Sequence, residues 1–255
     1  MQKTRILFMN TSIALLMIAC LGSTLPASST EAPGAEPVDA TAFHTPEEAV
    51  TRYLEGVAMA DVNYILQACA VDEMAEGFKF DQNAERLGVL MPLNSLSPAN
   101  HPFYVEINKT QVASQILNQI KMLTYSLLSE EDIEEPVIQL DAERINTFVT
   151  ATDPGRLAQL EIVKIGIPNP TRMEDARYKE NSAALAGVYG ADESTERVAL
   201  FNFEGDYYYS GFTLLRYGEN WKISSQTSPL AKTPAVGIPQ RTTVEEFDNL
   251  TSGGK

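Results

Sequence analysis

Three closely spaced runs of strand-forming residues limit the fold of this chain most strongly. Residues 197–203, 207–216 and 221–223 are rich in aromatic and β-branched side chains, which favour strands. Glu204-Gly205-Asp206 separates the first two runs and has the composition of a hairpin turn, and Tyr217-Gly218-Glu219-Asn220 turns the chain into the third run. Such short connections join antiparallel neighbours, because parallel strands need a long crossover. The sequence therefore predicts an antiparallel three-strand meander.

Helical periodicity marks the chain before these strands. Thr45-Pro46-Glu47-Glu48 is a capping box, and the apolar spacing after it predicts a helix over 45–59. Asp61 is expected to cap a second short helix that reaches Cys69. Apolar residues recurring every three or four positions predict a long amphipathic helix over 110–128. Further helices are expected over 82–91, 141–148 and 172–189, and short strands over 137–140 and 160–167.

Both ends of this region resemble a known superfamily. Residues 45–50 (Thr-Pro-Glu-Glu-Ala-Val), followed by Tyr53-Leu54 and Asp61, resemble the opening helices of the nuclear-transport-factor-2-like superfamily, as found in exported bacterial proteins. Residues 216–223 (Arg-Tyr-Gly-Glu-Asn-Trp-Lys-Ile) are similar to the closing hairpin of the same families, where a turn leads into a tryptophan-bearing last strand. Such domains usually run to roughly 120 residues, within the ordinary range for one domain. The longer middle, from 92 to 170, is therefore an insertion or an elaboration.

The resemblance implies an α+β domain over residues 44–227. Its N-terminal helices are expected to pack on a curved, mostly antiparallel sheet that ends in the three-strand meander, with the long helix inserted. The superfamily holds isomerases, dehydratases and many non-catalytic binding or dimerisation modules, so the fold does not choose a function. Residues 228–255 contain several prolines and glycines, and we expect them to form a mostly disordered tail.

The first 20 residues predict export. Two basic residues precede an apolar run over 6–18, as in the n-region and h-region of a secretory signal. The run ends at Met17-Ile18-Ala19-Cys20, which resembles the lipobox of bacterial lipoproteins, and Cys20 is then the lipidated N-terminus of the mature chain. The alternative is ordinary signal-peptidase cleavage after Ala27, which would give a secreted soluble protein.

The linker composition and the charge of the chain agree with a tethered extracytoplasmic protein. Residues 21–43 are small, polar and proline-rich, as in a flexible linker. The chain carries 34 Asp and Glu against 19 Lys and Arg, a net charge of −15 at pH 7. This excess argues against nucleic acid as a partner and against electrostatic adhesion to anionic lipid. We therefore expect a cell-membrane lipoprotein that contacts the membrane only through its N-terminal lipid.

The titratable side chains form no catalytic or metal-binding motif. Once Cys20 is cleaved off or lipidated, Cys69 is the one remaining cysteine, and its apolar helical face predicts a buried, inert thiol. His44 and His101 lack the clustered spacing of a zinc site or a catalytic triad. We expect no metal site and no cofactor.

The second strand of the meander supplies the candidate pocket residues. In the cone-shaped sheet that the resemblance implies, one of the two faces of this strand lines a pocket: either Tyr207, Tyr209, Gly211 and Thr213, or Tyr208, Ser210, Phe212 and Leu214. The candidate lining residues are Tyr207, Tyr208, Tyr209 and Phe212, together with Trp221 of the third strand. A tyrosine and a carboxylate such as Asp61 or Asp206 could together do acid–base chemistry. Half-buried packing of the tyrosines and cap or turn roles of the two aspartates explain these residues better than catalysis does.

We therefore expect a non-catalytic binding or interaction module at the membrane surface, with a small apolar ligand or a protein as partner. The alternative is a small-molecule isomerase or lyase that uses a pocket tyrosine and carboxylate. An open cavity with two convergent ionisable groups would favour the enzyme. A cavity filled by side chains of the long helix would favour a binding or structural role. The sequence predicts no oligomeric state.

Overall fold

The computed structural model describes residues 42–90, 95–129, 133 and 139–253. The expected signal segment and nearly all of the linker lie outside these ranges. The helices are α1 (Pro46–Ala58), α2 (Val62–Gln67), α3 (Val71–Gly77), α4 (Phe80–Leu87), α5 (Pro102–Leu128), α6 (Ala142–Ala151), the 3-10 helix η1 (Pro154–Gln159), α7 (Pro170–Met173), α8 (Ala176–Val188) and α9 (Val244–Thr251). The strands are β1 (Glu161–Gly166), β2 (Glu193–Phe203), β3 (Asp206–Tyr217), β4 (Asn220–Ser225) and β5 (Gln240–Arg241).

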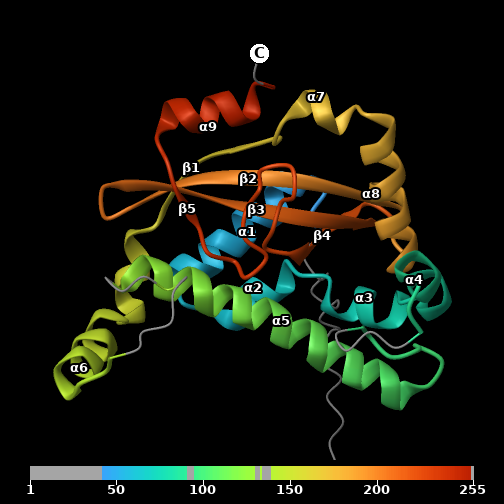
Figure 1. Ribbon diagram of the computed structural model, residues 1–255, viewed down its shortest axis with the longest axis horizontal. Helices are drawn as coiled ribbons and strands as arrows, with labels where there is room; N and C mark the ends of the chain where they lie inside the picture. The colour runs from blue at the N-terminus through green and yellow to red at the C-terminus, as the bar shows by residue number, and fades with distance from the viewer. Residues whose placement is uncertain (1–41, 91–94, 130–132, 134–138, 254–255) are drawn as a thin grey trace, which may run out of the picture. The chain divides into compact units, whose positions relative to one another are not determined.

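The strands form one antiparallel sheet in the order β1-β2-β3-β4, and β5 pairs with β3 (Figure 1). β2 and β3 pair along their whole length, from Glu193 opposite Arg216 to Phe203 opposite Asp206. The predicted meander is therefore confirmed, and β1 matches the strand expected over 160–167. The strand expected over 137–140 falls partly outside the described residues, and Gln139 and Leu140 belong to no strand.

Helix α1 packs on one face of the sheet and begins as the capping box predicts. The Glu48 N–H donates to Thr45 Oγ1 over 3.2 Å, and the Thr45 N–H donates to the Glu48 carboxylate over 3.4 Å. The apolar stripe of α1 contacts β1, β2 and β4. Its four members are at most 1% exposed: Val50, Tyr53, Leu54 and Val57. Burying a side chain of this size stabilises the fold by roughly 1.5–3 kcal/mol, so this stripe fixes α1 on the sheet.

The folded domain already includes Phe43, which the sequence analysis assigned to the linker. This side chain is 4% exposed. Its N–H donates to Asn220 Oδ1 over 2.8 Å, and its carbonyl accepts from the Trp221 N–H over 2.8 Å. The prediction of a linker through residue 43 is therefore wrong at its last position. Phe43 follows a run of small polar residues in the sequence, so the composition did not indicate that it bonds to the first residues of β4.

The long helix α5 begins earlier than the apolar spacing predicts. His101 Nδ1 accepts from the Phe103 N–H over 3.1 Å, and Pro102 occupies the first helical turn, where its missing N–H costs nothing. The apolar period predicts a start at residue 110, because the side chains in the first turns face outward and add nothing to that period. Val112, Ile116 and Leu123 carry the buried stripe.

Three other helices differ from the sequence predictions. α3 was not predicted, because seven residues are too few for a clear period. α4 ends at Leu87 instead of running to residue 91, since Gly88 adopts the left-handed conformation with φ of +65°. The helix expected over 172–189 is broken into α7 and α8 around Asp175.

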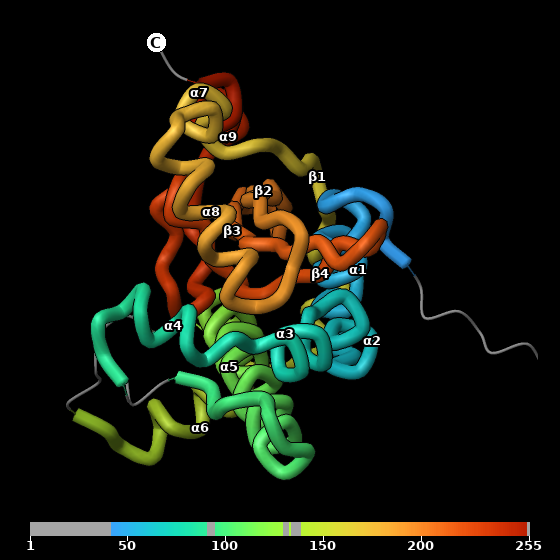
Figure 2. The backbone as a smooth tube through the Cα atoms, turned by 90° about the vertical axis from the view of Figure 1, so that its right-hand side faces the viewer, coloured from blue at the N-terminus to red at the C-terminus, as the bar shows by residue number. Residues whose placement is uncertain are grey.

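Residues after β4 cover the opposite face of the sheet, where the sequence analysis expected a mostly disordered tail. Thr243 and Glu246 form a second capping box that begins α9. Phe247 of α9 is 1% exposed, and its ring centroid lies 6.4 Å from that of Tyr209 in β3. Figure 2 shows α9 beside α7, and the Asn169 N–H donates to the Leu250 carbonyl over 2.9 Å. The prediction of disorder over 228–255 is therefore wrong for the described residues up to 253.

The architecture confirms the predicted fold class. The protein is an α+β domain in which helices pack on a curved antiparallel sheet, with a long helix across one side. A large apolar core fills the space between the sheet, α1 and α5, and a smaller apolar cluster lies under α9. Within the described ranges, none of the helices combines the length and the apolar character needed to cross a membrane.

Candidate functional site

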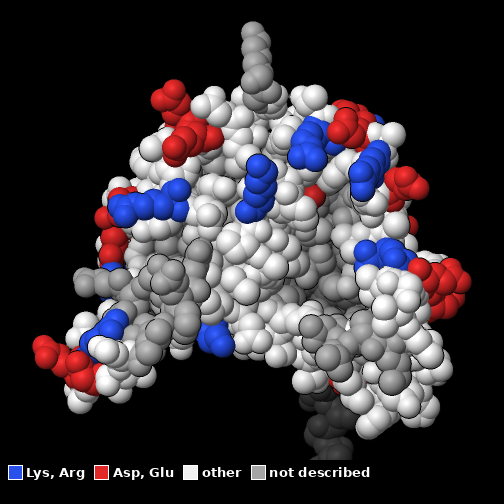
Figure 3. Space-filling view, in the orientation of Figure 1, with Lys and Arg blue, Asp and Glu red and all other residues white. Residues whose placement is uncertain are grey.

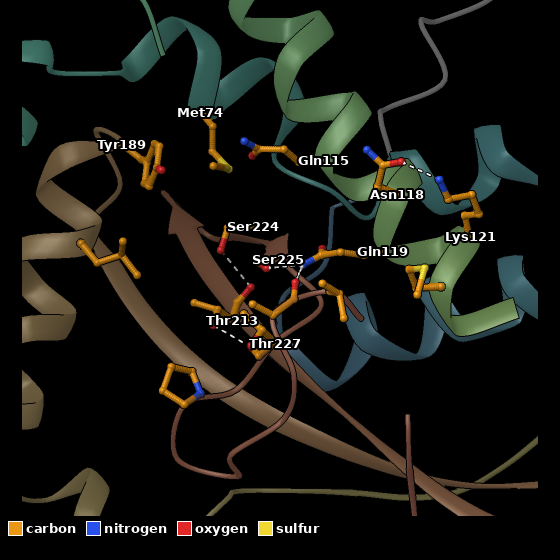
Figure 4. A pocket seen from close by; sticks show the side chains of 15 residues that line it. Met74, Gln115, Asn118, Gln119, Lys121, Tyr189, Thr213, Ser224, Ser225 and Thr227 are labelled. Carbon is orange, nitrogen blue, oxygen red and sulfur yellow. Dashed lines mark hydrogen bonds between the residues drawn. The ribbon is translucent and has the colours of Figure 1, made fainter. Parts of the chain in front are cut away.

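A cavity of about 710 Å³ opens between α5, the ends of β3 and β4, and the loop that follows β4 (Figure 4). α3 and α8 close it on the side away from the loop. Its size lies in the range of small-molecule sites, which is roughly 300–1,000 Å³. The lining residues are Met74, Gln115, Asn118, Gln119, Lys121, Met122, Leu185, Tyr189, Thr213, Ser224, Ser225, Thr227, Pro229, Ala235 and Val236.

A β-bulge shapes the sheet side of the cavity. Thr213 pairs with Ser225 and Leu214 with Ile223, so Ser224 is the extra residue and has no partner opposite it. A bulge of this kind redirects side chains locally. The Ser224 hydroxyl donates to the Thr213 carbonyl over 3.0 Å, and the Thr213 hydroxyl donates to the Thr227 carbonyl over 2.8 Å. These bonds hold the hydroxyl oxygens in place as part of a firm polar wall.

Gln119 of α5 ties the loop to the helix at the edge of the cavity. Its amide nitrogen donates to Ser225 Oγ and to the Ala235 carbonyl, each over 2.9 Å, and its amide oxygen accepts from the Gln226 N–H over 2.9 Å. Gly237 lies directly against this point with φ of +89°, and a Cβ there would come within 2.7 Å of the Gln119 carbonyl oxygen. Only glycine allows the loop to approach α5 so closely.

A second cavity of about 210 Å³ adjoins the first and shares Met74, Gln115 and Tyr189 with it. It extends toward α4, where Arg86 and Asn83 line it. Asn83 is 6% exposed, and its amide donates to Ser95 Oγ over 2.9 Å. The two cavities form a continuous recess along the side of α5, and we call it the α5 recess.

The α5 recess contains no side chain suited to acid–base chemistry near neutral pH. Neither cavity is lined by an aspartate, glutamate, histidine or cysteine of the described chain. Burial raises the pKa of Tyr189, and the nearby Arg86 guanidinium partly opposes this rise. No group of three or more His, Cys, Asp or Glu side chains in the described ranges is placed to hold a metal ion. The arrangement offers shape, apolar surface and hydrogen bonds.

No protein-family model matches the chain, and no curated protein matches it either. One similar solved structure is that of a cystatin-like protein from Ruminococcus gnavus ATCC 29149, with 23% sequence identity and a TM-score of 0.53. The match covers 77% of this chain and 44% of that one, so the chain spans less than half of the similar protein. The likeness shows the fold alone. Cystatin-like folds are related to the cone-shaped fold that the sequence resemblance implied.

The residues predicted to line a pocket lie elsewhere in the domain. Tyr207 is 36% exposed on the sheet, and Tyr208 stacks on Phe201 with 6.1 Å between ring centroids. Tyr209 faces the cluster under α9, and its hydroxyl donates to the Ala231 carbonyl over 3.4 Å. Burial is the main cause that raises the pKa of both Tyr208 and Tyr209. The two tyrosines therefore serve packing in this structure.

Phe212 and Trp221 belong to the apolar core. Phe212 is fully buried and meets Tyr53 edge-on, with 5.3 Å between ring centroids. Trp221 is 8% exposed, and the Arg216 guanidinium lies 5.8 Å from its ring centroid. Neither residue lines the two cavities of the α5 recess. On the predicted pocket strand, Thr213 does line the larger cavity, where it pairs with Ser225 beside the bulge.

The carboxylates weighed for acid–base chemistry have structural partners. Asp61 caps α2 by accepting from the Tyr64 N–H over 3.0 Å, and Asp206 lies 2.5 Å from the Arg241 guanidinium. A tyrosine–carboxylate pair exists outside the recess, between the half-buried Tyr178 and the buried Glu196. Glu196 accepts from Ser228 Oγ over 2.5 Å and from the Leu230 N–H over 3.0 Å, so it holds the loop in place.

Proposed function

We propose that this domain is a non-catalytic binding module whose ligand occupies the α5 recess. The observation that carries the proposal is the combination of an open cavity of ligand size with a lining of apolar and polar side chains that includes no described carboxylate. Enzymes that move protons place titratable groups with shifted pKa values inside the cavity. Here the recess holds Tyr189 without a carboxylate, whereas the Tyr178–Glu196 pair is engaged by the loop. The arrangement supports binding over the isomerase or lyase alternative.

The walls of the recess are also fixed before any ligand arrives. The bonds of Gln119 and Gln226 hold the loop against α5, and the bulge hydroxyls are bonded to main-chain carbonyls. Gln226 further donates to the Gly237 carbonyl over 2.8 Å and accepts from the buried Tyr53 hydroxyl over 2.8 Å. A preformed cavity binds with a smaller entropic cost than one that must be ordered by its ligand. This supports a receptor role for the recess.

We further propose that the domain is an elaborated nuclear-transport-factor-2-like cone carried outside the cytoplasm. The capping-box helix, the closing hairpin and the cystatin-like likeness support the cone assignment. The basic start, the apolar run and Ala19-Cys20 support export and lipid attachment at Cys20. A membrane-tethered binding module is the function that joins these features.

A neutral naphthylamine dye, which fluoresces when it enters an apolar site, tests the binding proposal. We expect saturable fluorescence enhancement with the wild-type domain. Ala235→Trp places a large ring in the mouth of the larger cavity at an exposed position, and we expect it to abolish the enhancement. Val149→Trp is the matched control, since Val149 is 66% exposed on α6 and lines neither cavity. Equal dye binding by Ala235→Trp and wild type would sink the proposal.

A further inference from the structure

The two sides of the α5 recess differ in the hydrogen-bonding groups that they leave for a ligand. On the sheet side, the hydroxyl hydrogens of Thr213, Ser224 and Thr227 are all given to main-chain carbonyls. On the helix side, Gln115, Asn118 and Lys121 follow one another at three-residue intervals, so they lie in a row along α5. We call these three residues the donor row. All three line the larger cavity.

The donor row keeps N–H groups for a ligand. The Lys121 ammonium donates to Asn118 Oδ1 over 3.1 Å, which occupies the amide oxygen and turns the amide nitrogen of Asn118 away from Lys121. Within the described chain, neither the amide nitrogen of Gln115 nor that of Asn118 donates a hydrogen bond to protein, and the same holds for the Tyr189 hydroxyl. Figure 4 shows Gln115 reaching from α5 toward Met74 and Tyr189, and Asn118 beside Lys121. The recess therefore presents donors to a ligand that supplies acceptors.

The charges of the recess have one sign. Lys121 lines the larger cavity and Arg86 the smaller one, and none of the described lining residues of either cavity is acidic. This contrasts with the chain as a whole, whose net charge is −15 at pH 7. On the face in Figure 3, Lys and Arg side chains lie both near the middle and at the edges, and most Asp and Glu side chains lie toward the edges. An anionic ligand is favoured at this recess, because its described lining contains Lys121 and Arg86 and no acidic side chain.

The remaining lining is apolar and adaptable. Met74, Met122, Leu185, Pro229 and Val236 provide aliphatic surface on three sides of the larger cavity. Methionine side chains are flexible and polarisable, so they adapt to an unbranched chain more readily than branched residues do. An apolar ligand body with one anionic, acceptor-only head matches the donors, the charge and the apolar walls together.

We infer that the α5 recess binds an amphiphile with a carboxylate head, with the head at the donor row and the aliphatic chain against the methionines. This inference rests on the proposed binding function and names the class of its ligand. Lys121 and the Asn118 amide contact the carboxylate, and Gln115 contacts it or the first polar atom of the chain. A charge-assisted hydrogen bond is stronger than a neutral one, so the carboxylate is preferred over an alcohol of equal length.

Competition with the naphthylamine dye measures this preference, using dodecanoate, dodecanol and dodecyltrimethylammonium at concentrations below micelle formation. We expect dodecanoate to displace the dye from the wild-type domain at a concentration at least about tenfold lower than dodecanol. One charge-assisted hydrogen bond raises the affinity by about this factor. Dodecyltrimethylammonium should be the weakest competitor. Added salt should reduce the preference for the carboxylate, because Lys121 is exposed.

Two variants test where the carboxylate head of the ligand binds. Both substitutions are at exposed positions, where the fold tolerates a change. Lys121→Met should bring the dodecanoate preference to less than about threefold, and Asn118→Asp should weaken dodecanoate while leaving dodecanol unchanged. Lys179→Met, on α8 and outside the lining of both cavities, is the matched control and should behave as wild type. Dodecanol competing as well as dodecanoate, or an unchanged preference in Lys121→Met, overturns this inference while the binding proposal stands. Absence of dye binding in the wild type overturns the binding proposal itself.

Discussion

A single carboxamide, that of Gln119, connects α5 to the end of β4 and to the loop beyond it. The residue is 9% exposed and makes three hydrogen bonds, to Ser225, Ala235 and Gln226. Its neighbour Gln115 occupies the same helix one turn earlier but lies at the surface without a protein partner in the described chain. The same residue type therefore has two different roles on one helix.

Gln119→Leu is expected to destabilise the domain by about 1–3 kcal/mol. The substitution keeps the size of the side chain but leaves the buried Gln226 N–H without a partner, and a buried unpaired group costs roughly 1–3 kcal/mol. Gln115→Leu is the control and should change stability by less than about 0.5 kcal/mol. Urea unfolding followed by circular dichroism measures both values. Equal losses in the two variants would contradict the anchoring role of Gln119.

Cys69 makes stability depend on pH in the alkaline range. Burial raises the pKa of the Cys69 thiol, Lys222 opposes the rise and Glu73 adds to it. The folded state therefore retains the thiol proton when the unfolded chain has lost it, so the stabilisation is complete below the unfolded pKa of about 8.5 and declines as pH rises above it. This agrees with the buried, inert thiol that the sequence predicts.

Between about pH 8.5 and 10, we expect wild type to lose stability more steeply than Cys69→Ala. One group that titrates only in the unfolded state contributes a slope of up to about 1.4 kcal/mol per pH unit. The comparison uses the slope from denaturant unfolding at several pH values, so a constant cost of the smaller side chain does not affect it. Parallel stability curves for the two proteins would show that the thiol ionises freely in the native state.

At the scale of elements, α9 is a structural part of the domain. Phe247→Ala should destabilise the fold by roughly 3–5 kcal/mol, because the side chain is 1% exposed in the cluster with Val198, Leu200 and Ala231. Val244→Ala is the matched control on the same helix, where the side chain is 37% exposed, and should cost less than about 1 kcal/mol. Thermal unfolding measures both variants. If Phe247→Ala changes the stability only slightly, α9 is a loosely attached tail and not a structural part of the domain.

The sequence predicts those elements whose local signals agree with their tertiary role. The capping box at Thr45 and the turn at Glu204-Gly205 mark α1 and the hairpin because cap and turn chemistry are local. The start of α5 is missed because Phe103 and Tyr104 in its first turn are exposed and lie outside the apolar stripe. The whole of α9 is missed as well. Thr243 and Glu246 also form a capping box, but the prolines and glycines around it dominate the composition.

The candidate site is harder to predict than the fold. A strand face of the meander indicated the tyrosines, yet the cavity lies beside the bulge at Ser224, between the end of β4 and α5. A bulge depends on the register between two strands, which the sequence pattern does not contain. Among the lining residues, the polar series Gln115, Asn118 and Gln119 on this amphipathic helix was the available signal. The role of each of these residues depends on whether its side chain contacts the loop after β4.

At the scale of the whole molecule, the proposed lipid attachment at Cys20 can be tested directly. When the full chain is expressed in a bacterial host, we expect it to partition into detergent with a modified Cys20 at the mature N-terminus. Cys20→Ser should move it to the aqueous phase, because the lipid is removed while the domain is unchanged. Phase separation followed by mass spectrometry of the N-terminal peptide measures both. An unmodified mature chain that starts near Ser28 would support simple secretion instead.

The contacts that close the core also determine when the chain can fold. Phe43 bonds to Asn220 across 177 positions, and Tyr53 bonds to Gln226 across 173. The strands of the meander lie in the last quarter of the chain. The apolar stripe of α1 therefore cannot pack on them until that part has been synthesised. Domains with such distant pairings fold slowly and depend on the whole chain being present. We therefore expect the sheet and its contacts with α1 to form only after most of the chain has been synthesised.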